Sequence, residues 1–466
     1  MARKSKAAGN SGPVEGPWEL PEGWRWERLG DLAEFINGAA FKPSDWHGEG
    51  RPIIRIQNLT NPEKSPNLTR SVLADKYIVE AGDILLSWSA TLDVFVWRGE
   101  NAWLNQHIFK IANIRPDVDK RFFRFLLKNE IETLKRSEHL HGSTMMHINR
   151  GPFMAHPVPI PPIATQVEIA ARIDALFSEI DEGEAVLTKA RAGLETYRKS
   201  LLKWSVTGGL TADWRHDNPP QETGEQLLQH ILADRRARWH ANPKNARKRY
   251  AEPVNAKIGD LHDLPMGWTW ATIEQICDPN RPIAYGVLQP GADQQDGVPL
   301  IRVTDVADGQ IQQNNLKRID RSIAAKFPRT FLRGGEVLLT LVGSIGRTAI
   351  VPSELVGSNV ARAIAVLPAT GCTALWLEQV LRYEPNRLAL EGVSHEVARK
   401  TLNLEDVRPF PVPVPPRAEE AVLVERVSNL LENSKNQGST VSRQAAAAFT
   451  LRQSILAAAF RGELAT

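Results

Sequence analysis

The chain has 466 residues, 42% of them hydrophobic and 24% charged, and its formal net charge at pH 7 is +3. This length allows two or three domains with separate cores, and the composition is typical of a globular protein. The chain has no apolar run of 18 or more residues, so the sequence predicts no transmembrane helix. Its two cysteines, Cys277 and Cys372, are too few for a disulfide framework or a four-cysteine zinc site. We therefore expect a cytoplasmic protein.

The first segment, residues 1–17, is basic and then rich in glycine and proline. It has no apolar stretch of the kind found in secretory signals, and we interpret it as a disordered tail. Across the chain there are 38 Arg and 19 Lys. Arg can contact a guanine edge or a phosphate through two parallel hydrogen bonds, which favours a nucleic-acid partner. A GC-rich genome would produce the same bias, so both interpretations stay open.

The rest of the chain contains one ordered set of motifs twice. The second member of each pair follows the first by 244 to 254 residues, and this period indicates a tandem duplication of domains. The paired segments are Leu20–Trp26 with Leu264–Trp270, Ile53–Asn58 with Leu300–Asp305, Ala81–Ser87 with Gly334–Thr340, Pro157–Pro162 with Pro411–Pro416, and Arg198–Thr211 with Arg452–Ala465.

Each copy begins with a mixed domain, predicted over residues 18–162 and 264–416. Short strands such as Pro52–Ile56 and Asp83–Trp88 alternate with turns rich in Gly, Pro and Asn. A helix is predicted over about residues 119–134, because apolar residues recur on one helical face. A proline-rich segment then ends each domain, since proline cannot continue a helix. The apolar face consists of Phe122, Phe123, Leu126, Leu127, Ile131 and Leu134.

A long helix follows each domain, over residues 163–207 and 417–466. In the first helix, apolar residues alternate at spacings of three and four, which predicts a buried coiled-coil seam. The matching seam of the second helix is weaker and partly polar, and its polar positions are expected to set the register of the pair. We expect the two helices to pair antiparallel, giving an α+β fold of two duplicated mixed α/β domains separated by the helix pair. The first seam is Ile173, Leu176, Ile180, Gly183, Leu187, Ala190, Leu194, Tyr197, Leu201 and Trp204, and the second is Val427, Leu430, Ser434, Gln437, Val441, Gln444, Ala448, Leu451, Ile455 and Ala458.

Between the first long helix and the second domain, residues 208–263 are predicted to form a polar, basic linker. Leu227, Leu228, Ile231 and Leu232 indicate a short amphipathic helix within it. Two basic runs follow, RRAR at Arg235–Arg238 and KNARKR at Lys244–Arg249. Such runs are either solvated charges or a strip that contacts phosphates, and the sequence leaves both interpretations open.

The motifs of several enzyme classes are absent. The nearest match to an adenine-methyltransferase loop, NPPQ at Asn218–Gln221, has Gln where an aromatic ring is needed. Gly343–Thr348 lacks the lysine of a phosphate-binding loop, and the histidines have no metal-ligand spacing. No Lys has an acidic residue two positions before it, as a restriction-type nuclease core requires. We therefore predict a binding protein with no catalytic or metal site.

The order of these motifs resembles the specificity (S) subunits of type I restriction–modification enzymes, from about Trp18 to Ala465. The resemblance is carried by the LPxGW openings, the GDILLS and GEVLLT strands, the PVPIPP and PVPVPP exits, and the repeated ending SLLKWSVTGGLT and SILAAAFRGELA. In the family, Pro-Pro-x-x-Glu-Gln begins the long helices. Here Thr165 replaces that Glu in the first copy, and Glu420 replaces that Gln in the second.

The resemblance implies two target-recognition domains, each reading half of a bipartite double-stranded DNA sequence. It also implies that the long helices fix the spacing and dock two modification (methyltransferase) subunits, and that restriction (motor-nuclease) subunits join the complex. In the family, S-adenosylmethionine, ATP and Mg²⁺ are bound by the partner subunits, so we expect no cofactor on this chain. The alternative is a solitary architectural or regulatory protein that binds two DNA sites and is active without partners.

By analogy with the family, loops that follow the matched strands face the DNA. Instead of contacting DNA, any one residue in these loops could simply stabilise its loop. Asp305 could also fix the side chain of a neighbouring Arg. The candidate DNA-binding residues are Arg55, Gln57, Asn58, Ser89, Thr91, Asn105, Gln106, His107, Ser143, Thr144 and His147 in the first copy, and Arg302, Thr304, Asp305, Ser344, Arg347, Asn359, Arg362, Ser394, His395, Arg399 and Lys400 in the second.

Overall fold

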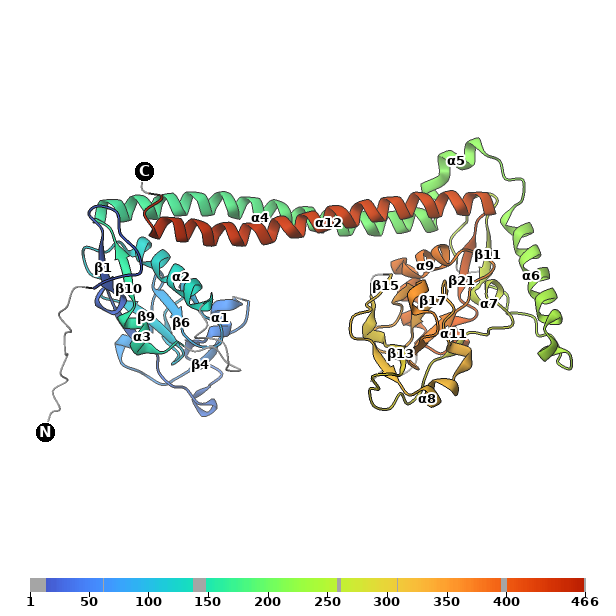
Figure 1. Ribbon diagram of the computed structural model, residues 1–466, viewed down its shortest axis with the longest axis horizontal. Coiled ribbons are helices and arrows are strands. Elements are labelled where there is room, and N and C mark those ends of the chain that lie inside the picture. Colours follow the sequence, from blue (N-terminus) through green and yellow to red (C-terminus); the bar gives the residue numbers. More distant parts are fainter. Residues whose placement is uncertain are drawn as a thin grey trace. The chain divides into compact units, whose positions relative to one another are not determined.

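The computed structural model describes residues 14–61, 63–136, 148–257, 261–307, 309–394 and 400–464. The chain forms two compact units (Figure 1): unit 1 comprises Met1–Thr188 with Val441–Thr466, and unit 2 comprises Lys189–Thr440. Two helices of 44 residues, α4 (Ile163–Val206) and α12 (Arg417–Phe460), each contribute to both units. None of the described helices combines the length and apolar composition that a membrane span needs.

Unit 1 contains two four-stranded sheets and one strand pair. The first sheet has the order β2-β9-β6-β7 and is antiparallel, whereas the second, β4-β3-β8-β5, contains the parallel pair β3–β8. Strand β1 pairs with β10, which joins the start of the domain to its proline-rich end. The strands are β1 (Arg25–Arg28), β2 (Glu34–Asn37), β3 (Arg51–Ile54), β4 (Asn67–Thr69), β5 (Ile78–Val79), β6 (Ile84–Ser87), β7 (Asp93–Val96), β8 (Ala102–Leu104), β9 (Ile108–Ala112) and β10 (Pro157–Ile160).

Unit 2 repeats this topology. Its sheet β12-β20-β17-β18 corresponds to β2-β9-β6-β7, its sheet β16-β13-β19 keeps the parallel pair as β13–β19, and β11 pairs with β21 as β1 does with β10. The duplication predicted from the sequence is therefore present in the fold. The strands are β11 (Thr269–Thr272), β12 (Ala284–Tyr285), β13 (Val298–Ile301), β14 (Val306–Ala307), β15 (Gln310–Ile311), β16 (Lys317–Ile319), β17 (Val337–Thr340), β18 (Thr348–Ile350), β19 (Asn359–Val360), β20 (Ile364–Leu367) and β21 (Pro411–Val414).

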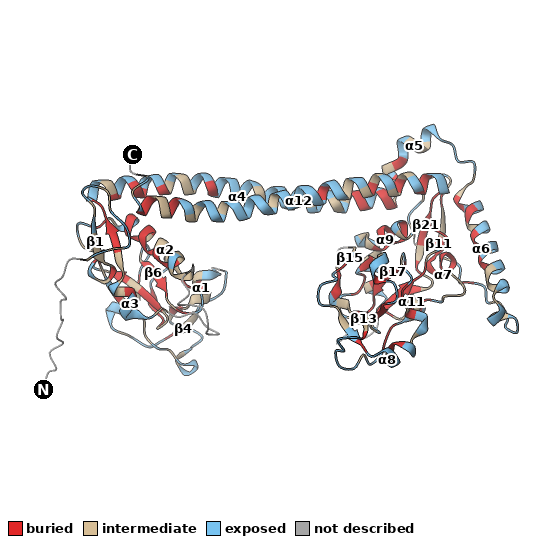
Figure 2. Ribbon diagram, in the orientation of Figure 1, coloured by how far each residue is buried: buried red, intermediate tan, exposed pale blue. Residues whose placement is uncertain are grey.

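Shorter helices complete the two units. In unit 1, α2 covers the predicted helix and buries Phe122, Phe123, Leu126, Leu127 and Ile131. These side chains pack with the α12 residues Ile455, Leu456, Ala459 and Phe460 in one hydrophobic core, which Figure 2 shows as buried. The shorter helices are α1 (Ile56–Thr60), α2 (Lys120–Arg136), α3 (Arg150–Ala155), α5 (Ala212–Asp217), α6 (Gly224–Ala241), α7 (Ile273–Ile276), α8 (Arg321–Ala325), α9 (Ala374–Arg382), α10 (Glu384–Gly392) and α11 (Leu404–Val407).

The long helices pair antiparallel in each unit, as predicted. In unit 1, Arg452 of α12 contacts the carboxylates of Asp181 and Glu184 of α4, at 2.5 and 2.8 Å. In unit 2, the Nε and Nη2 atoms of Arg198 donate to the hydroxyl and carbonyl of Ser434, each at 3.0 Å. Residues late in one helix therefore lie beside residues early in the other.

The predicted seam is wrong at seven positions, which are exposed. At five of these the next residue is at least half-buried instead, namely Glu184, Arg198, Ser205, Gly438 and Arg452. A straight α-helix has 3.6 residues per turn, so a seam spaced at 3.5 drifts by about 20° in each heptad. The contact therefore passes to a position one residue further along. The exposed positions are Gly183, Ala190, Tyr197, Trp204, Gln437, Gln444 and Leu451.

The segment predicted as a linker, residues 208–263, contains α5 and a longer helix than expected, the 18-residue α6. Leu227 and Ile231 of α6 are buried against unit 2, in agreement with the predicted amphipathic face. Of the tail predicted over residues 1–17, residues 1–13 lie outside the described part of the chain, and Gly16 lies against the ring of Trp26. The domain boundaries themselves stay predictions.

The starts of the two long helices differ in one buried hydrogen-bonding group. In unit 1, the amide of Gln166 accepts from Asp119 N at 2.8 Å and donates to the carbonyls of Asp117 and Pro161, at 3.0 and 2.9 Å. At the matching position in unit 2, Glu420 Oε1 accepts from Thr373 N at 2.7 Å. A carboxylate has no proton to donate, and the buried Oε2 has no hydrogen-bond partner among the described residues.

We expect Glu420→Gln to stabilise the protein at neutral pH by about 1–3 kcal/mol, because a buried unsatisfied oxygen is replaced by a donor. Burial raises the pKa of Glu420 above its ordinary value of 4.5. The wild-type carboxyl therefore destabilises the fold progressively as pH rises from the unfolded pKa to the folded one. Urea denaturation of both proteins at several pH values should show the difference disappearing below about pH 4.

The first copy supplies a matched control, Gln166→Glu, which should destabilise the protein at neutral pH. A Glu420→Gln protein less stable than wild type at neutral pH would contradict this account, since Arg417 Nη1, 3.7 Å from Oε2, would then stabilise the charge sufficiently.

Candidate nucleic-acid interface

Four loops of unit 1 meet where its two sheets adjoin. They follow β2, β3 and β6 and connect β8 with β9. Ala39 N donates to Leu104 O at 2.9 Å and Asn105 N to Ile54 O at 3.2 Å, so the loops after β2 and β3 both contact the β8–β9 connection. The loop after β6 joins them through Trp88 N, which donates to the carbonyl of His107 at 3.3 Å.

The same four loops meet in unit 2. Val287 N donates to Val360 O at 2.7 Å, and Ala361 N to Ile301 O at 2.9 Å. Leu341 N, after β17, donates to Ala363 O at 2.7 Å, as Trp88 does to His107 in unit 1. We call these two groups of loops the loop cluster of unit 1 and the loop cluster of unit 2.

One glycine in each loop cluster allows the close approach. A Cβ atom at Gly38 would lie 2.1 Å from the carbonyl oxygen of Asn105, and one at Gly286 would lie 1.9 Å from that of Val360. Real Cβ atoms do not come so near to backbone, so only glycine fits at either position. The duplicated glycines therefore bring the loop backbones together in the same way in both units.

Aromatic rings support the polar residues of the unit 1 loop cluster. The Arg55 guanidinium lies over the ring of Trp46, 5.4 Å from its centroid, and Trp46 is 40% exposed. The ring of His107 lies 5.3 Å from that of Trp88, and its Nε2 lies 3.2 Å from Nε2 of Gln106. These stacked groups have few alternative rotamers, which preorganises the surface for a ligand.

Three of the unit 1 candidates are buried in this state. Asn58 accepts from Arg55 N at 3.1 Å and donates to Lys64 O at 2.9 Å, so it holds the loop after β3. Ser89 and Asn105 are 4% and 8% exposed. The remaining described candidates, which are half-buried or exposed, are Arg55, Gln57, Thr91, Gln106 and His107.

In unit 2, the candidates Arg302, Asp305 and Asn359 have structural partners. Arg302 donates to Asp305 through Nε and Nη2, at 3.0 and 2.9 Å, and these hydrogen bonds raise the pKa of Arg302. Asp305 therefore fixes the side chain of Arg302, which is the alternative to a direct DNA contact considered for Asp305 above. Asn359 is fully buried between Thr330 and Phe327.

The other described candidates of unit 2 differ in exposure. Ser394 is half-buried and donates to Glu391 O at 2.6 Å. The exposed candidates are Thr304, Ser344, Arg347, Arg362 and Lys400. Five candidates from both units lie outside the described residues: Ser143, Thr144, His147, His395 and Arg399.

Two aromatic residues beside the loop clusters were missed in the sequence analysis. Trp46 is paired with Arg55, and Tyr285, which is 37% exposed, accepts a hydrogen bond from Leu404 N at 3.1 Å. Nothing in the spacing of either residue distinguishes an exposed aromatic ring from a buried one. Trp103, in contrast, is 3% exposed and belongs to the core.

The titratable groups of the described residues offer few reactive centres. Among them, no group of three His, Cys, Asp or Glu is placed to hold a metal ion. Burial raises the pKa of the Cys277 thiol to about 12 and that of Cys372 well above its ordinary value. Both thiols are therefore protonated at neutral pH and poor nucleophiles.

Comparison with known proteins finds relatives that share one description, the specificity subunit of a type I restriction enzyme. Residues 21–187 match the family model for the type I restriction modification DNA specificity domain. The type I restriction enzyme EcoBI specificity subunit of Escherichia coli is 30% identical over 455 residues, which cover 97% of this chain and 88% of that protein. The EcoKI specificity subunit of Escherichia coli strain K12 is 23% identical, with coverage of 96% and 90%.

A solved structure shares the fold. A chain from a study of complex assembly and conformational transition in the type I R-M system superposes with a TM-score of 0.64 at 18% identity. The match covers 96% of this chain and 100% of that chain.

Proposed function

The chain belongs to the family of type I restriction enzyme specificity subunits, and we propose that it reads a bipartite DNA sequence, one half with each loop cluster. The observation that carries this proposal is the repetition of one loop arrangement, glycine included, in two units with separate cores. The glycine is kept in both copies, whereas other loop residues differ between them, such as Gln57 and Thr304 or Asn58 and Asp305, as two half-sites of different sequence require.

The clearest difference lies at the first residue after β3 and β13. Arg302 is held by the carboxylate of Asp305, whereas Arg55 has Asn58 at the corresponding position and lies over Trp46 instead. The amide of Asn58 gives Arg55 no charged partner. Arg55 can therefore offer both edges of its guanidinium to a guanine, the most common specific contact in the major groove.

We expect Arg55→Ala to weaken binding to the target by about 1–3 kcal/mol and to relax discrimination at one position of the unit 1 half-site. Equilibrium binding to duplexes with each single base change measures both effects. Arg302→Ala is the matched comparison in the other copy. A uniform loss on all sequences for Arg55→Ala would identify a phosphate contact and contradict the base-reading role.

The chain is further proposed to be non-catalytic and to direct partner subunits. Apolar residues on the long helices are exposed, including Val186 at 64%, Trp204 at 57% and Phe449 at 58%. Contiguous exposed apolar surface marks interaction sites, and we propose that these residues contribute to contacts with the two modification subunits. S-adenosylmethionine, ATP and Mg²⁺ would then be bound by the modification and restriction subunits.

Activity assays of the purified chain test this division of labour. Supplied with target DNA, S-adenosylmethionine, ATP and Mg²⁺, the chain alone should neither methylate nor cut. Addition of its modification subunits should produce methylation. Methylation or cleavage by the isolated chain, purified from cells lacking other methyltransferases and nucleases, would contradict the proposal.

A further inference from the structure

Residues 224–250 of unit 2 carry positive charge that the loop cluster does not use. They comprise α6, the 3₁₀ turn Pro243–Asn245 and the residues up to Tyr250, and we call them the basic arm. Arg235–Arg238 contains three arginines and Lys244–Arg249 four cations, and neither run contains an acidic residue.

The near part of the basic arm is fixed to the core of unit 2. Leu227 and Ile231 are 5% and 6% exposed and pack in the main hydrophobic core. Arg235 is also buried and donates to the backbone carbonyl of Cys277. Fully burying a Leu or Ile side chain contributes about 1.5–3 kcal/mol, so this part of the arm is firmly attached.

The far part is fixed by polar contacts around Asn280. The side-chain amides of Asn242 and Asn245 donate to Asn280 Oδ1 at 2.7 and 2.9 Å, and Asn280 Nδ2 donates to Arg238 O at 3.0 Å. The rings of Trp239 and Tyr250 lie edge to face with their centroids 5.4 Å apart, so the last residue of the arm contacts the end of α6. The second basic run is therefore held between two fixed points.

Four exposed cations of the second run, Lys244, Arg247, Lys248 and Arg249, form no side-chain ion pair with any described residue. In the first run, Arg236 pairs with Glu252. Like charges held this close repel one another, and an external polyanion would remove that repulsion. The arrangement is thus complementary to a dense row of negative charge.

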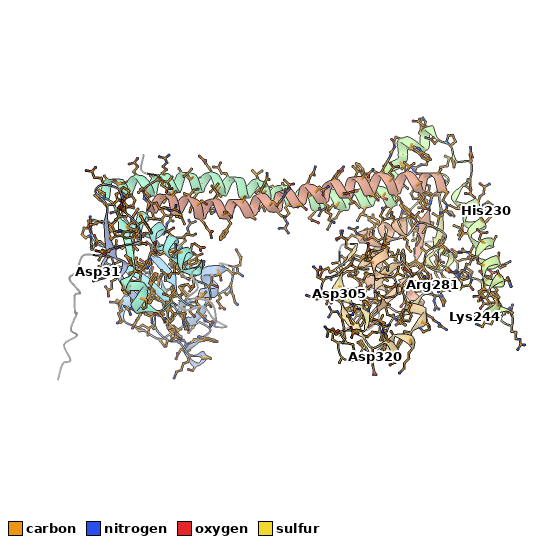
Figure 3. All side chains as sticks on the ribbon, viewed as in Figure 1. Asp31, His230, Lys244, Arg281, Asp305 and Asp320 are labelled. Carbon is orange, nitrogen blue, oxygen red and sulfur yellow. The ribbon has the colours of Figure 1, made fainter. Side chains whose placement is uncertain are left out.

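We infer that the basic arm binds the phosphate backbone of duplex DNA that flanks the half-site read by unit 2. This inference rests on the proposed function, which brings duplex DNA to unit 2. Figure 3 shows Lys244 and Asp305 at opposite sides of unit 2, so the arm does not take part in base reading. Duplex DNA carries one negative charge per about 1.7 Å of its axis, which four neighbouring cations can contact without any sequence requirement.

Salt-dependent binding of the complex with its modification subunits tests the inference. The variant replaces Lys244, Arg247, Lys248 and Arg249 with Gln, and the control exchanges Lys and Arg at the same positions, which keeps the charge. Two duplexes are compared, one extending well beyond the target and one trimmed to it. On the long duplex, the slope of log affinity against log salt should become less steep by about 0.9 per lost contact, up to about 3.6.

The expected result is this change for the Gln variant on the long duplex only, with the control unchanged and the methylated sequence unaltered. An unchanged slope on the long duplex would overturn the inference, as would an equal change on the trimmed duplex. Loss of subunit assembly in the Gln variant would also overturn it, in favour of an acidic protein surface. Failure of the proposed function is distinguishable, because wild-type complex would then show no preference for the target over other duplexes.

Discussion

Replacing residues 264–415 with the matching region of the EcoBI specificity subunit should change one half of the methylated sequence and leave the other half intact. The reason is that unit 2 has its own hydrophobic core and its own loop cluster, repeated from unit 1. The segment is bounded by the strand pair β11–β21, so it can be exchanged as a closed element. Sequencing of methylated bases in cells expressing the hybrid with modification subunits measures the result.

The reciprocal replacement of residues 20–161 is the control, and it should change only the other half. Here too the exchanged region is closed by a strand pair, β1–β10. If a single replacement changed both halves, or if an active hybrid kept the original target, the assignment of one half-site to each unit would be wrong.

Glu419→Ala should destabilise the protein by about 3–5 kcal/mol, because it leaves a partly buried charge without its partner. Glu419 is 1% exposed, and its two oxygens accept from Thr211 at 2.6 Å, Arg215 at 3.1 Å and Trp268 at 2.9 Å. This cluster joins the start of α12 to the segment after α4 and to the strand region of unit 2. Urea denaturation followed by circular dichroism measures the loss.

A double-mutant cycle isolates the charge interaction. In an Arg215→Ala background, Glu419→Ala should cost distinctly less, since the cation that depends on it is gone. Glu419→Gln, which keeps an acceptor and the shape of the side chain, should cost less than Glu419→Ala. A loss below about 1 kcal/mol for Glu419→Ala alone would show that the cluster contributes little to stability.

The architecture was accessible from the sequence because it depends on patterns that repeat. The duplicated motifs predicted duplicated domains, the apolar face of Phe122 to Ile131 predicted α2, and the spacing of apolar residues predicted the antiparallel helices. What the pattern missed was the drift along the helices. Because the periodicity of a straight helix differs from 3.5, the sequence placed Tyr197 and Trp204 in the seam, whereas Arg198 and Ser205 occupy it.

The loop clusters were less accessible, because their residues take their roles from contacts between distant segments. The sequence predicted loops around Asn58 and Asn359, whereas Asn58 lies in α1 and Asn359 in β19. Both are buried, and their side chains form hydrogen bonds with backbone groups. Arg55 and Arg302 occupy the same position in the two copies, but only Arg302 has a carboxylate partner. The sequence shows that Asn58 in the first copy is replaced by Asp305 in the second. The contacts of Arg55 and Arg302 are needed to see that this replacement decides which arginine has a charged partner.

Mapping methylated bases in a host without methyltransferases of its own tests the central claim most directly. The modification subunits are expressed with and without this chain, and methylation is read by single-molecule sequencing. We predict methylation at one bipartite sequence when the chain is present, a changed base preference at one position with Arg55→Ala, and no sequence-specific methylation without the chain. Methylation of the same bipartite sequence in the absence of the chain would contradict the account, because another protein would then be reading the DNA.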